Sequence, residues 1–113
     1  MSNPSVTVII PSVRNHEELD IVLKGLSNQT YNGPCKIVVV GPTNDPGKEV
    51  CKENNILFID DEGSRTRADA CNIAINATES ELILFTDDDV IVPKDWIEKL
   101  VSWFSREDVS GVG

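Results

Sequence analysis

The stretch 82-LILFTDDD-89 joins an apolar run to three consecutive aspartates, Asp87, Asp88 and Asp89. The apolar run is typical of a buried strand, so the carboxylates are expected at the carboxyl end of a strand. At about 4 Å, two like charges repel by about 1 kcal/mol in water and by about 4 kcal/mol at an effective dielectric of roughly 20. A bound cation would relieve that repulsion. The stretch therefore predicts a metal site, and the alternative is a solvated acidic turn.

The spacing of the aspartates indicates which of them would share the ion. In extended backbone, alternate side chains lie on one face, so Asp87 and Asp89 would converge on the metal while Asp88 points elsewhere. Hard carboxylate oxygens suit Mg²⁺ or Mn²⁺, ions that often share their ligand shell with the phosphates of a substrate.

Strand-like and helix-like segments alternate along the whole chain. Apolar runs predict strands at residues 6–10, 37–40, 56–59, 82–85 and, as a beginning only, 109–113. Helices are expected from a capping box at Asn15, from Asp45 as the cap before Pro46, from Thr66 and from Pro93. The first helix would have residues 19, 22, 23 and 26 on its apolar face, and the last would have residues 97, 100, 101 and 104. The third would carry Ile73, Ile75 and Ala77.

This alternation predicts an α/β fold, with three layers and a mainly parallel, doubly wound, Rossmann-like sheet. The carboxyl ends of such strands form one binding rim, here the loops 11–14, 41–45, 60–67 and 87–89. There is no G-x-G-x-x-G and no Walker lysine loop, which argues against dinucleotide and P-loop sites. Arg65 and Arg67, at a helix start, could hold an anion, or could simply neutralise the neighbouring acidic residues.

Composition narrows the function further. The 113 residues, 40% of them hydrophobic, predict a single domain covering 1–113. A net charge of −9 argues against binding to nucleic acid or to anionic membranes, and no apolar run is long enough to span a bilayer. Cys35, Cys51 and Cys71 form no C-x-x-C pair, so reduced, mostly buried thiols in a cytoplasmic protein are expected.

Five motifs follow one another along nearly the whole chain. They are V-x-V-I-I-P-S ending at Ser12, L-x-x-V-L-x-x-L-x-x-Q-T-Y ending at Tyr31, K-I-V-V-V ending at Val40, R-A-D-A-C-N from Arg67, and L-I-L-F-T-D-D-D-V-I-V-P-K-D-W ending at Trp96. In this order and spacing the chain resembles the family 2 glycosyltransferases of the GT-A fold. The resemblance implies a nucleotide-diphospho-sugar donor, Mn²⁺ or Mg²⁺, and transfer of the sugar to an acceptor hydroxyl with inversion.

The resemblance also implies roles for single residues. Asp87 and Asp89 match the metal-binding D-x-D positions, with Asp89 in direct contact, and Asp88 is expected near the ribose. The loop along the nucleoside is matched by Pro11 and Ser12, and the basic position near the base and phosphates by Arg67. Arg14 and Gly41, on the same rim, complete the predicted nucleotide-sugar-binding set.

Two departures from the family pattern limit these expectations. The acidic pair after the second strand, V-V-D-D-G-S in the family, is replaced by Gly41-Pro42-Thr43, so the nucleotide cannot be inferred. The family domain is longer than this chain, and its catalytic base is expected beyond Gly113. The chain is therefore interpreted as a donor-binding half whose acceptor is unknown.

Two other functions remain open. The first is a non-catalytic interaction module, with a homodimer face at the surface left open by the missing half; Trp96 and Trp103 would lie on it, unless they pack in the core. The second is a receiver-type phospho-acceptor, which would need acidic residues where this chain has Pro11-Ser12-Val13.

Overall fold

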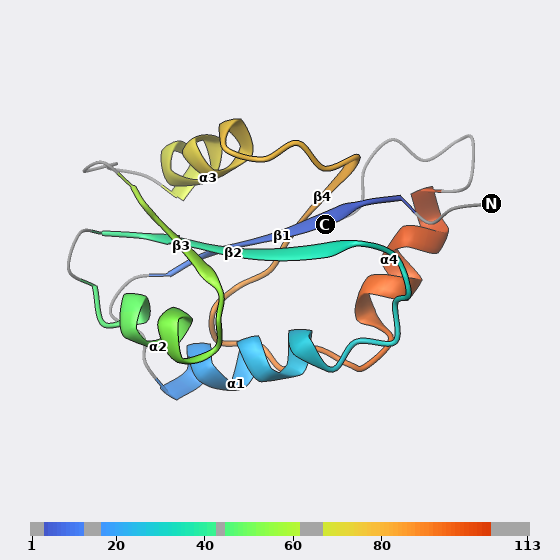
Figure 1. Ribbon diagram of the computed structural model, residues 1–113, viewed down its shortest axis with the longest axis horizontal. Coiled ribbons are helices and arrows are strands. Elements are labelled where there is room, and N and C mark those ends of the chain that lie inside the picture. The colour runs from blue at the N-terminus through green and yellow to red at the C-terminus, as the bar shows by residue number, and fades with distance from the viewer. Residues whose placement is uncertain (1–3, 13–16, 43–44, 62–66, 105–113) are drawn as a thin grey trace.

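Strands and helices alternate throughout the part of the chain that the structure describes. It is a computed structural model that describes residues 4–12, 17–42, 45–61 and 67–104, with Arg67, Ala68, Trp103 and Phe104 as backbone only. The elements are β1 (Val6–Pro11), α1 (Glu17–Ser27), β2 (Cys35–Gly41), α2 (Gly47–Glu53), β3 (Leu57–Asp60), α3 (Arg67–Asn76), β4 (Leu82–Phe85) and α4 (Trp96–Phe104) (Figure 1). The four predicted strands up to residue 85 are confirmed, and each of the four predicted helices is present, although α4 begins at Trp96 and not at Pro93. The predicted helix starts at Asn15 and Thr66 lie outside the described residues. The predicted strand at 109–113 lies outside the described residues.

The sheet of these described strands is entirely parallel and has the order β3-β2-β1-β4. β1 pairs with β2 on one side, where Val6 is opposite Cys35, and with β4 on the other, where Val6 is opposite Leu82. The chain thus adds strands outward to β3 and then returns to the far side of β1, so the strand order reverses beside β1. A receiver-type domain has the order 2-1-3-4-5, so the observed order argues against that alternative.

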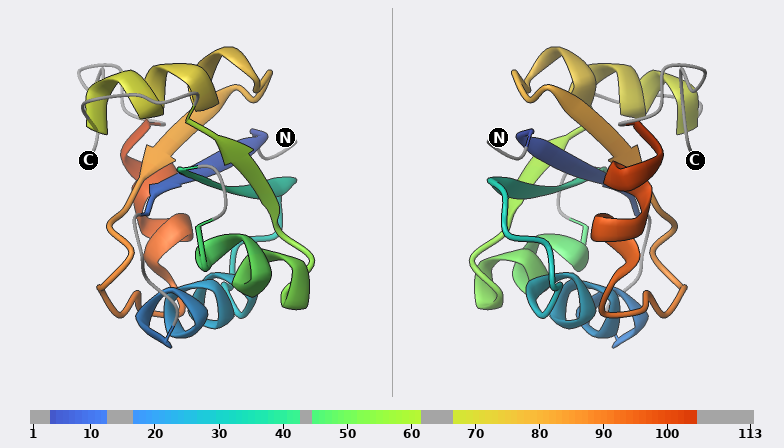
Figure 2. Two further views of the ribbon diagram at one scale, coloured as in Figure 1. Left: turned by 90° about the vertical axis from the view of Figure 1, so that its left-hand side faces the viewer. Right: turned by 90° about the vertical axis from the view of Figure 1, so that its right-hand side faces the viewer.

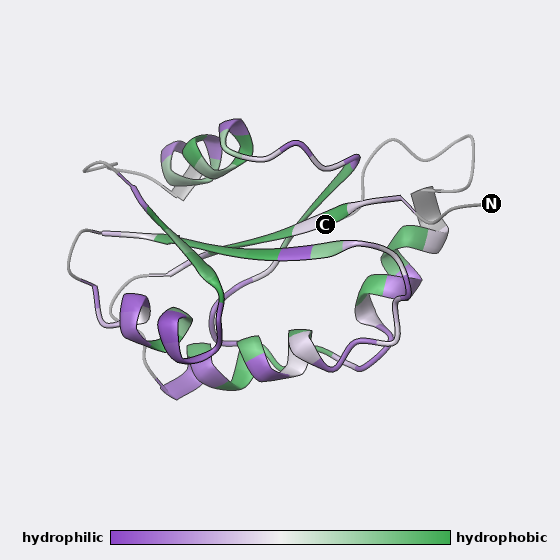
Figure 3. Ribbon diagram, in the orientation of Figure 1, coloured by the Kyte–Doolittle hydropathy of each residue, from purple (hydrophilic) through white to green (hydrophobic). Residues whose placement is uncertain are grey.

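Helices cover both faces of the sheet. α3 lies on one face, and α1, α2 and α4 lie on the other (Figure 2). The larger core cluster joins β1 to the second group of helices through buried residues such as Val8, Leu23 and Ile97. The strands are the most continuously apolar part of the chain (Figure 3), as expected for a sheet buried on both faces. The predicted three-layer α/β/α fold is confirmed.

The face that α3 turns to the sheet consists mainly of small side chains. Ala70 and Ala74 are buried against Ile9, Val38 and Val40, and Ile75 packs only partly there. Ala77 was expected within the helix, but it lies one residue beyond the end of α3 and is exposed. Small side chains at the contact let the helix lie close to the sheet, and an expectation based on large apolar residues misses them.

The first turn of α2 begins as the sequence predicted. Pro46 has helical dihedrals, φ −59° and ψ −23°, and the Gly47 N–H donates to Asp45 Oδ2 at 2.8 Å. This is the bond that an N-cap carboxylate makes to a free amide of the first turn. Asp45 is 5% exposed, so a buried carboxylate at the rim already has a structural role.

The other side chains on which predictions were made have mixed outcomes. Trp96 packs partly against the larger core cluster, in agreement with the core alternative, whereas the side chain of Trp103 is not described. Cys51 is buried and Cys71 half-buried, but Cys35 is exposed, so the thiols are free yet less buried than expected. None of the helices in the described segments is long and apolar enough to cross a membrane.

We expect Ala74→Leu to lower the free energy of unfolding by about 1–3 kcal/mol, because the added methylenes have no space between α3 and the sheet. Urea unfolding measures the change. Ala77→Leu is the matched control, and at its exposed position the change should stay within about 0.5 kcal/mol. Equal losses in the two variants would contradict the close packing of α3.

Burial raises the pKa of the Cys51 thiol from 9.0 to about 12, and the charge of Asp45 adds to the shift. In the unfolded chain the thiol ionises at its ordinary pKa, so between the two values the unfolded state binds fewer protons than the folded one. The stabilising contribution of this thiol is therefore complete below the unfolded pKa. The free energy of unfolding should fall as the pH rises from 9 toward 12.

Urea unfolding at several pH values measures this slope, with Cys51→Ala as the control. The variant is expected to be less stable overall but to have a flatter profile. The pKa of Tyr31 is also raised, mainly by burial, so only the difference between the two profiles reports Cys51. Parallel profiles would contradict the expectation.

Candidate functional site

A side-chain hydrogen bond joins the ends of β1 and β4. Ser12 directly follows β1, is 2% exposed, and donates from Oγ to Asp88 Oδ2 at 2.9 Å. The backbone beside it is also tied, since the Thr86 N–H donates to the Ile9 carbonyl at 3.2 Å. Residues 12 and 88 therefore meet where the strand order reverses, which is where open α/β sheets bind ligands.

Backbone hydrogen bonds continue the same rim to β2 and β3. The Ser12 N–H donates to the Val40 carbonyl at 2.9 Å, and the Asp61 N–H donates to the Gly41 carbonyl at 2.8 Å. The carboxyl ends of all four strands are thus linked in a row. The predicted meeting of loops at one rim is confirmed for the described parts of those loops.

The three aspartates have different environments. Asp87 and Asp89 are exposed, and Asp88 is half-buried. β4 ends at Phe85, and residues 88–89 form a turn. The prediction of extended backbone through the triplet is therefore wrong for Asp88 and Asp89. We call residues 87–89 the aspartate turn. Even without extended backbone, Asp88 differs from its neighbours, because the Ser12 hydroxyl holds its carboxylate at the β1 end.

The aspartate turn fits a metal that shares its ligands with a substrate, rather than a metal held by protein alone. Within the described ranges, no group of three or more His, Cys, Asp or Glu side chains is arranged to hold an ion. Asp87 and Asp89 nevertheless offer carboxylate oxygens at the surface. Mg²⁺ is commonly bound by one or two carboxylates, several waters and substrate phosphates, and this donor set matches that description.

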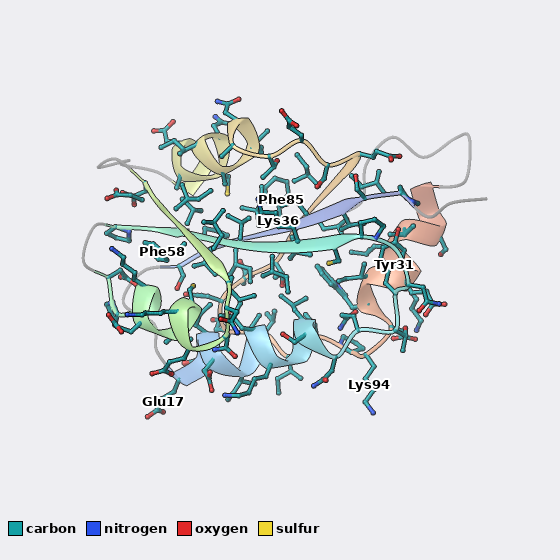
Figure 4. The ribbon with its side chains drawn as sticks, in the orientation of Figure 1. Glu17, Tyr31, Lys36, Phe58, Phe85 and Lys94 are labelled. Carbon is teal, nitrogen blue, oxygen red and sulfur yellow. The ribbon has the colours of Figure 1, made fainter. Side chains whose placement is uncertain are left out.

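Gly41, predicted at the site, occupies a tightly enclosed position at the end of β2. A β-carbon at residue 41 would overlap the Ser12 carbonyl oxygen and lie 3.2 Å from a ring atom of Phe58. Phe58 lies on the α2 side of the sheet (Figure 4). The close approach therefore leaves no room for a side chain at position 41 with this backbone.

The remaining predicted residues are described in part. Pro11 is the last residue of β1 and is half-buried, next to Ser12. Arg67 is the first residue of α3, which places its backbone at a helix start, but its side chain is not described. Arg14 and Arg65 lie outside the described residues.

One acidic residue at the rim was not included among the site candidates. Asp61 follows β3 directly and is 7% exposed, and its backbone binds Gly41. Asp61 was expected only as one of the acidic neighbours that Arg65 and Arg67 could neutralise. Its position after a strand was the available signal, but burial of a carboxylate depends on the neighbouring strand and has no sequence pattern.

We expect Gly41→Ala to lower the free energy of unfolding by about 1–3 kcal/mol, because the new methyl group forces the Ser12 carbonyl away from β2. Urea unfolding provides the measurement. Gly25→Ala is the control, since its added carbon would meet a methyl group of Val92 at 3.2 Å and the nearest backbone atom, the Val92 carbonyl oxygen, only at 3.8 Å. A Gly41→Ala protein as stable as the wild type would contradict the enclosed geometry.

Comparison with known proteins places the chain in a family. The model of glycosyl transferase family 2 matches residues 7–113. An N-acetylglucosaminyltransferase of Azorhizobium caulinodans is 32% identical, with 96% of this chain and 30% of that protein covered. Glycosyltransferase AglE of Haloferax volcanii is 30% identical, with 97% and 38% covered. The chain thus spans about a third of the length of these relatives.

Solved structures show the same fold. The mannosyltransferase PcManGT from Pyrobaculum calidifontis, in complex with GDP-Man and Mn²⁺, is similar with a TM-score of 0.85 at 23% identity, covering 96% of this chain and 34% of that one. Glucosyl-3-phosphoglycerate synthase from Mycobacterium tuberculosis, in complex with Mn²⁺, UDP and glucosyl-3-phosphoglycerate, has a TM-score of 0.70 at 16% identity, covering 88% and 38%.

At these identities the likeness establishes the fold, which is the GT-A type. The match of the family model is independent of that likeness and covers nearly every residue of the chain. The chain belongs to glycosyl transferase family 2.

Proposed function

We propose that residues 1–113 form the donor-binding unit of a glycosyltransferase. The ligand is a nucleoside-diphosphate sugar with Mn²⁺ or Mg²⁺, and the sugar is transferred to an acceptor hydroxyl with inversion. The observation that supports this most is the hydrogen bond from Ser12 to Asp88. It unites the loop expected along the nucleoside with the aspartate turn, at the point where the strand order reverses.

Each proposed residue has a distinct task. Ser12 orients Asp88, which then faces the nucleoside side of the rim and is available to the ribose. Asp87 and Asp89 hold the metal. The nucleotide-sugar set as a whole is Pro11, Ser12, Arg14, Gly41, Arg67, Asp87 and Asp88.

Charge explains why an ion is needed at this rim. The chain carries a net charge of −9, and the two exposed carboxylates would repel a diphosphate that arrived alone. The amino-terminal end of α3, which begins at Arg67, favours an anion through its free amides and dipole. A divalent ion on Asp87 and Asp89, together with that helix start, would give the diphosphate attractive contacts on two sides.

The chemistry that the ion supplies when bound is Lewis-acid stabilisation of the leaving diphosphate. In the proposed transfer, the bond from the anomeric carbon to the diphosphate oxygen breaks, and its electron pair leaves with the diphosphate. A bond to the acceptor oxygen forms on the opposite face of the sugar, and the acceptor proton passes to a general base. We assign that base to none of the described rim residues.

The alternative is a non-catalytic module with the same fold, including a homodimer through the face of α4. It predicts that the wild-type protein has no metal-dependent affinity for nucleotide sugars. The cytoplasmic location remains a prediction, supported by three free cysteines.

Calorimetric titration with UDP and GDP sugars, each with and without Mn²⁺, tests the proposal. We expect Mn²⁺-dependent binding of one of these donors. In Asp89→Asn it should weaken by at least about tenfold, the size of effect seen when even a supporting group of a metal site is removed. Thermal stability should not change, since Asp89 is exposed.

Glu81→Gln is the matched control, because it removes one negative charge from an exposed residue at the opposite end of β4. Its donor affinity should equal that of the wild type. Absence of donor binding in the wild type, or equal weakening in both variants, would overturn the proposal.

A further inference from the structure

The aspartate turn continues into a short segment that returns to the core. Residues 90–95 lead from Asp89 to α4, which begins at Trp96. From Asp89 to Pro93 there are four Cα–Cα steps, which span at most about 14 Å. Whatever fixes Pro93 therefore restricts the positions that Asp89 can reach.

The side chain of Gln29 is hydrogen-bonded both to this segment and to α4. Gln29 follows α1, and its Nε2 donates to the Pro93 carbonyl at 2.6 Å. Its Oε1 accepts from the Ile97 N–H at 2.9 Å. Ile97 is in the first turn of α4, whose amides have no partner within their own helix. One carboxamide thus caps α4 and also holds Pro93, three residues before the helix begins.

Thr30 and Gly25 make further contacts with this segment and with α4. The Thr30 N–H donates to the Lys94 carbonyl at 2.8 Å, and Thr30 Oγ1 donates to Glu98 Oε2 at 2.5 Å. On α1, Gly25 lies so close to Val92 that a β-carbon there would be 3.2 Å from its Cγ2. Lys94 projects away from the sheet beside the end of α1 (Figure 4), so at this residue the backbone makes the contact.

Hydrogen bonds consequently hold the chain before, within and after the aspartate turn. Before it, Thr86 is bonded to Ile9, and within it Asp88 is bonded to Ser12. After it, Pro93 and Lys94 are bonded to Gln29 and Thr30. A loop with both ends fixed has few conformations to lose when it binds a ligand.

We propose that Gln29, assisted by Thr30, is a positioning residue for the metal-binding aspartates. It touches neither donor nor metal; it holds the segment after the turn, so that Asp87 and Asp89 keep their places. This inference rests on the proposed function for the role of the turn, but the positioning itself can be measured without any ligand.

Backbone ¹⁵N relaxation of the ligand-free protein gives the first test. In the wild type, the order parameters of Asp87, Asp88 and Asp89 should be near the rigid value of about 0.85, and in Gln29→Ala they should fall toward about 0.6. Values in β1 should not change, which separates positioning from a general loss of structure. Asn28→Ala is the matched control, because the Asn28 side-chain amide directly after α1 donates to the Lys24 carbonyl of that helix at 3.2 Å.

Titration with Mn²⁺ and GDP or UDP gives the second test. Gln29→Ala should weaken Mn²⁺-dependent binding by about 5–10-fold, a loss comparable to that of an outer partner of a metal ligand, with nucleotide binding in the absence of metal unchanged. If Gln29→Ala does not fold, Thr30→Val, which removes only the hydroxyl contact to Glu98, is measured in the same way and should show a smaller change in the same direction.

The outcomes separate the two proposals. Order parameters that change only at residues 93–98 would overturn the positioning role, whatever the titration shows. A wild type that binds Mn²⁺ and nucleotide, with equal affinity in Gln29→Ala, would also overturn it. A wild type without any metal-dependent binding would overturn the proposed function, while a loosened aspartate turn in Gln29→Ala would still support positioning by Gln29.

Discussion

The pairing of β1 with a parallel neighbour on each side is the constraint on which the rest of this structure depends. Its residues 6–10 are buried, so their backbone groups must find partners in the sheet, and β2 and β4 provide them. Because the chain adds β2 and β3 on one side and β4 on the other, the strand order reverses beside β1. That reversal brings Ser12 to Asp88 across 76 residues of sequence, and it creates the rim where a ligand can bind.

The acidic residues of this rim divide into structural and exposed groups. Asp45 caps α2 and is buried, and Asp61 is buried beside the end of β2. Asp88 is held by Ser12, while Asp87 and Asp89 are exposed at the surface. The aspartate turn thus presents two exposed carboxylates on a chain whose net charge is −9. Gln29 and Thr30, which follow α1, are hydrogen-bonded to the segment after the turn, so contacts flank the turn on both sides.

Much of the fold could be predicted because it depends on local pattern. The β-branched runs predicted β1 and β2, the spacing of apolar residues predicted α1, and the Asp45-Pro46 pair predicted the start of α2. The contact face of α3 could not be predicted in this way, since Ala70 and Ala74 are apolar but small, and only the distance to the sheet makes them core residues. The family could be predicted because five motifs, several of which join a strand end to the loop after it, occur in the family's order and spacing.

The sequence by itself determined the elements, the parallel α/β class, the family and the rim on which the aspartates lie. Periodicity and short motifs carry this information, and each of them can be recognised within a short stretch of the chain. The tertiary structure alone decided the bond between Ser12 and Asp88, the close approach that requires glycine at position 41, and the hold of Gln29 on the segment after the aspartate turn. Each of these joins residues from different elements, whose separation in space is set by packing of the whole sheet and its helices and by no local pattern.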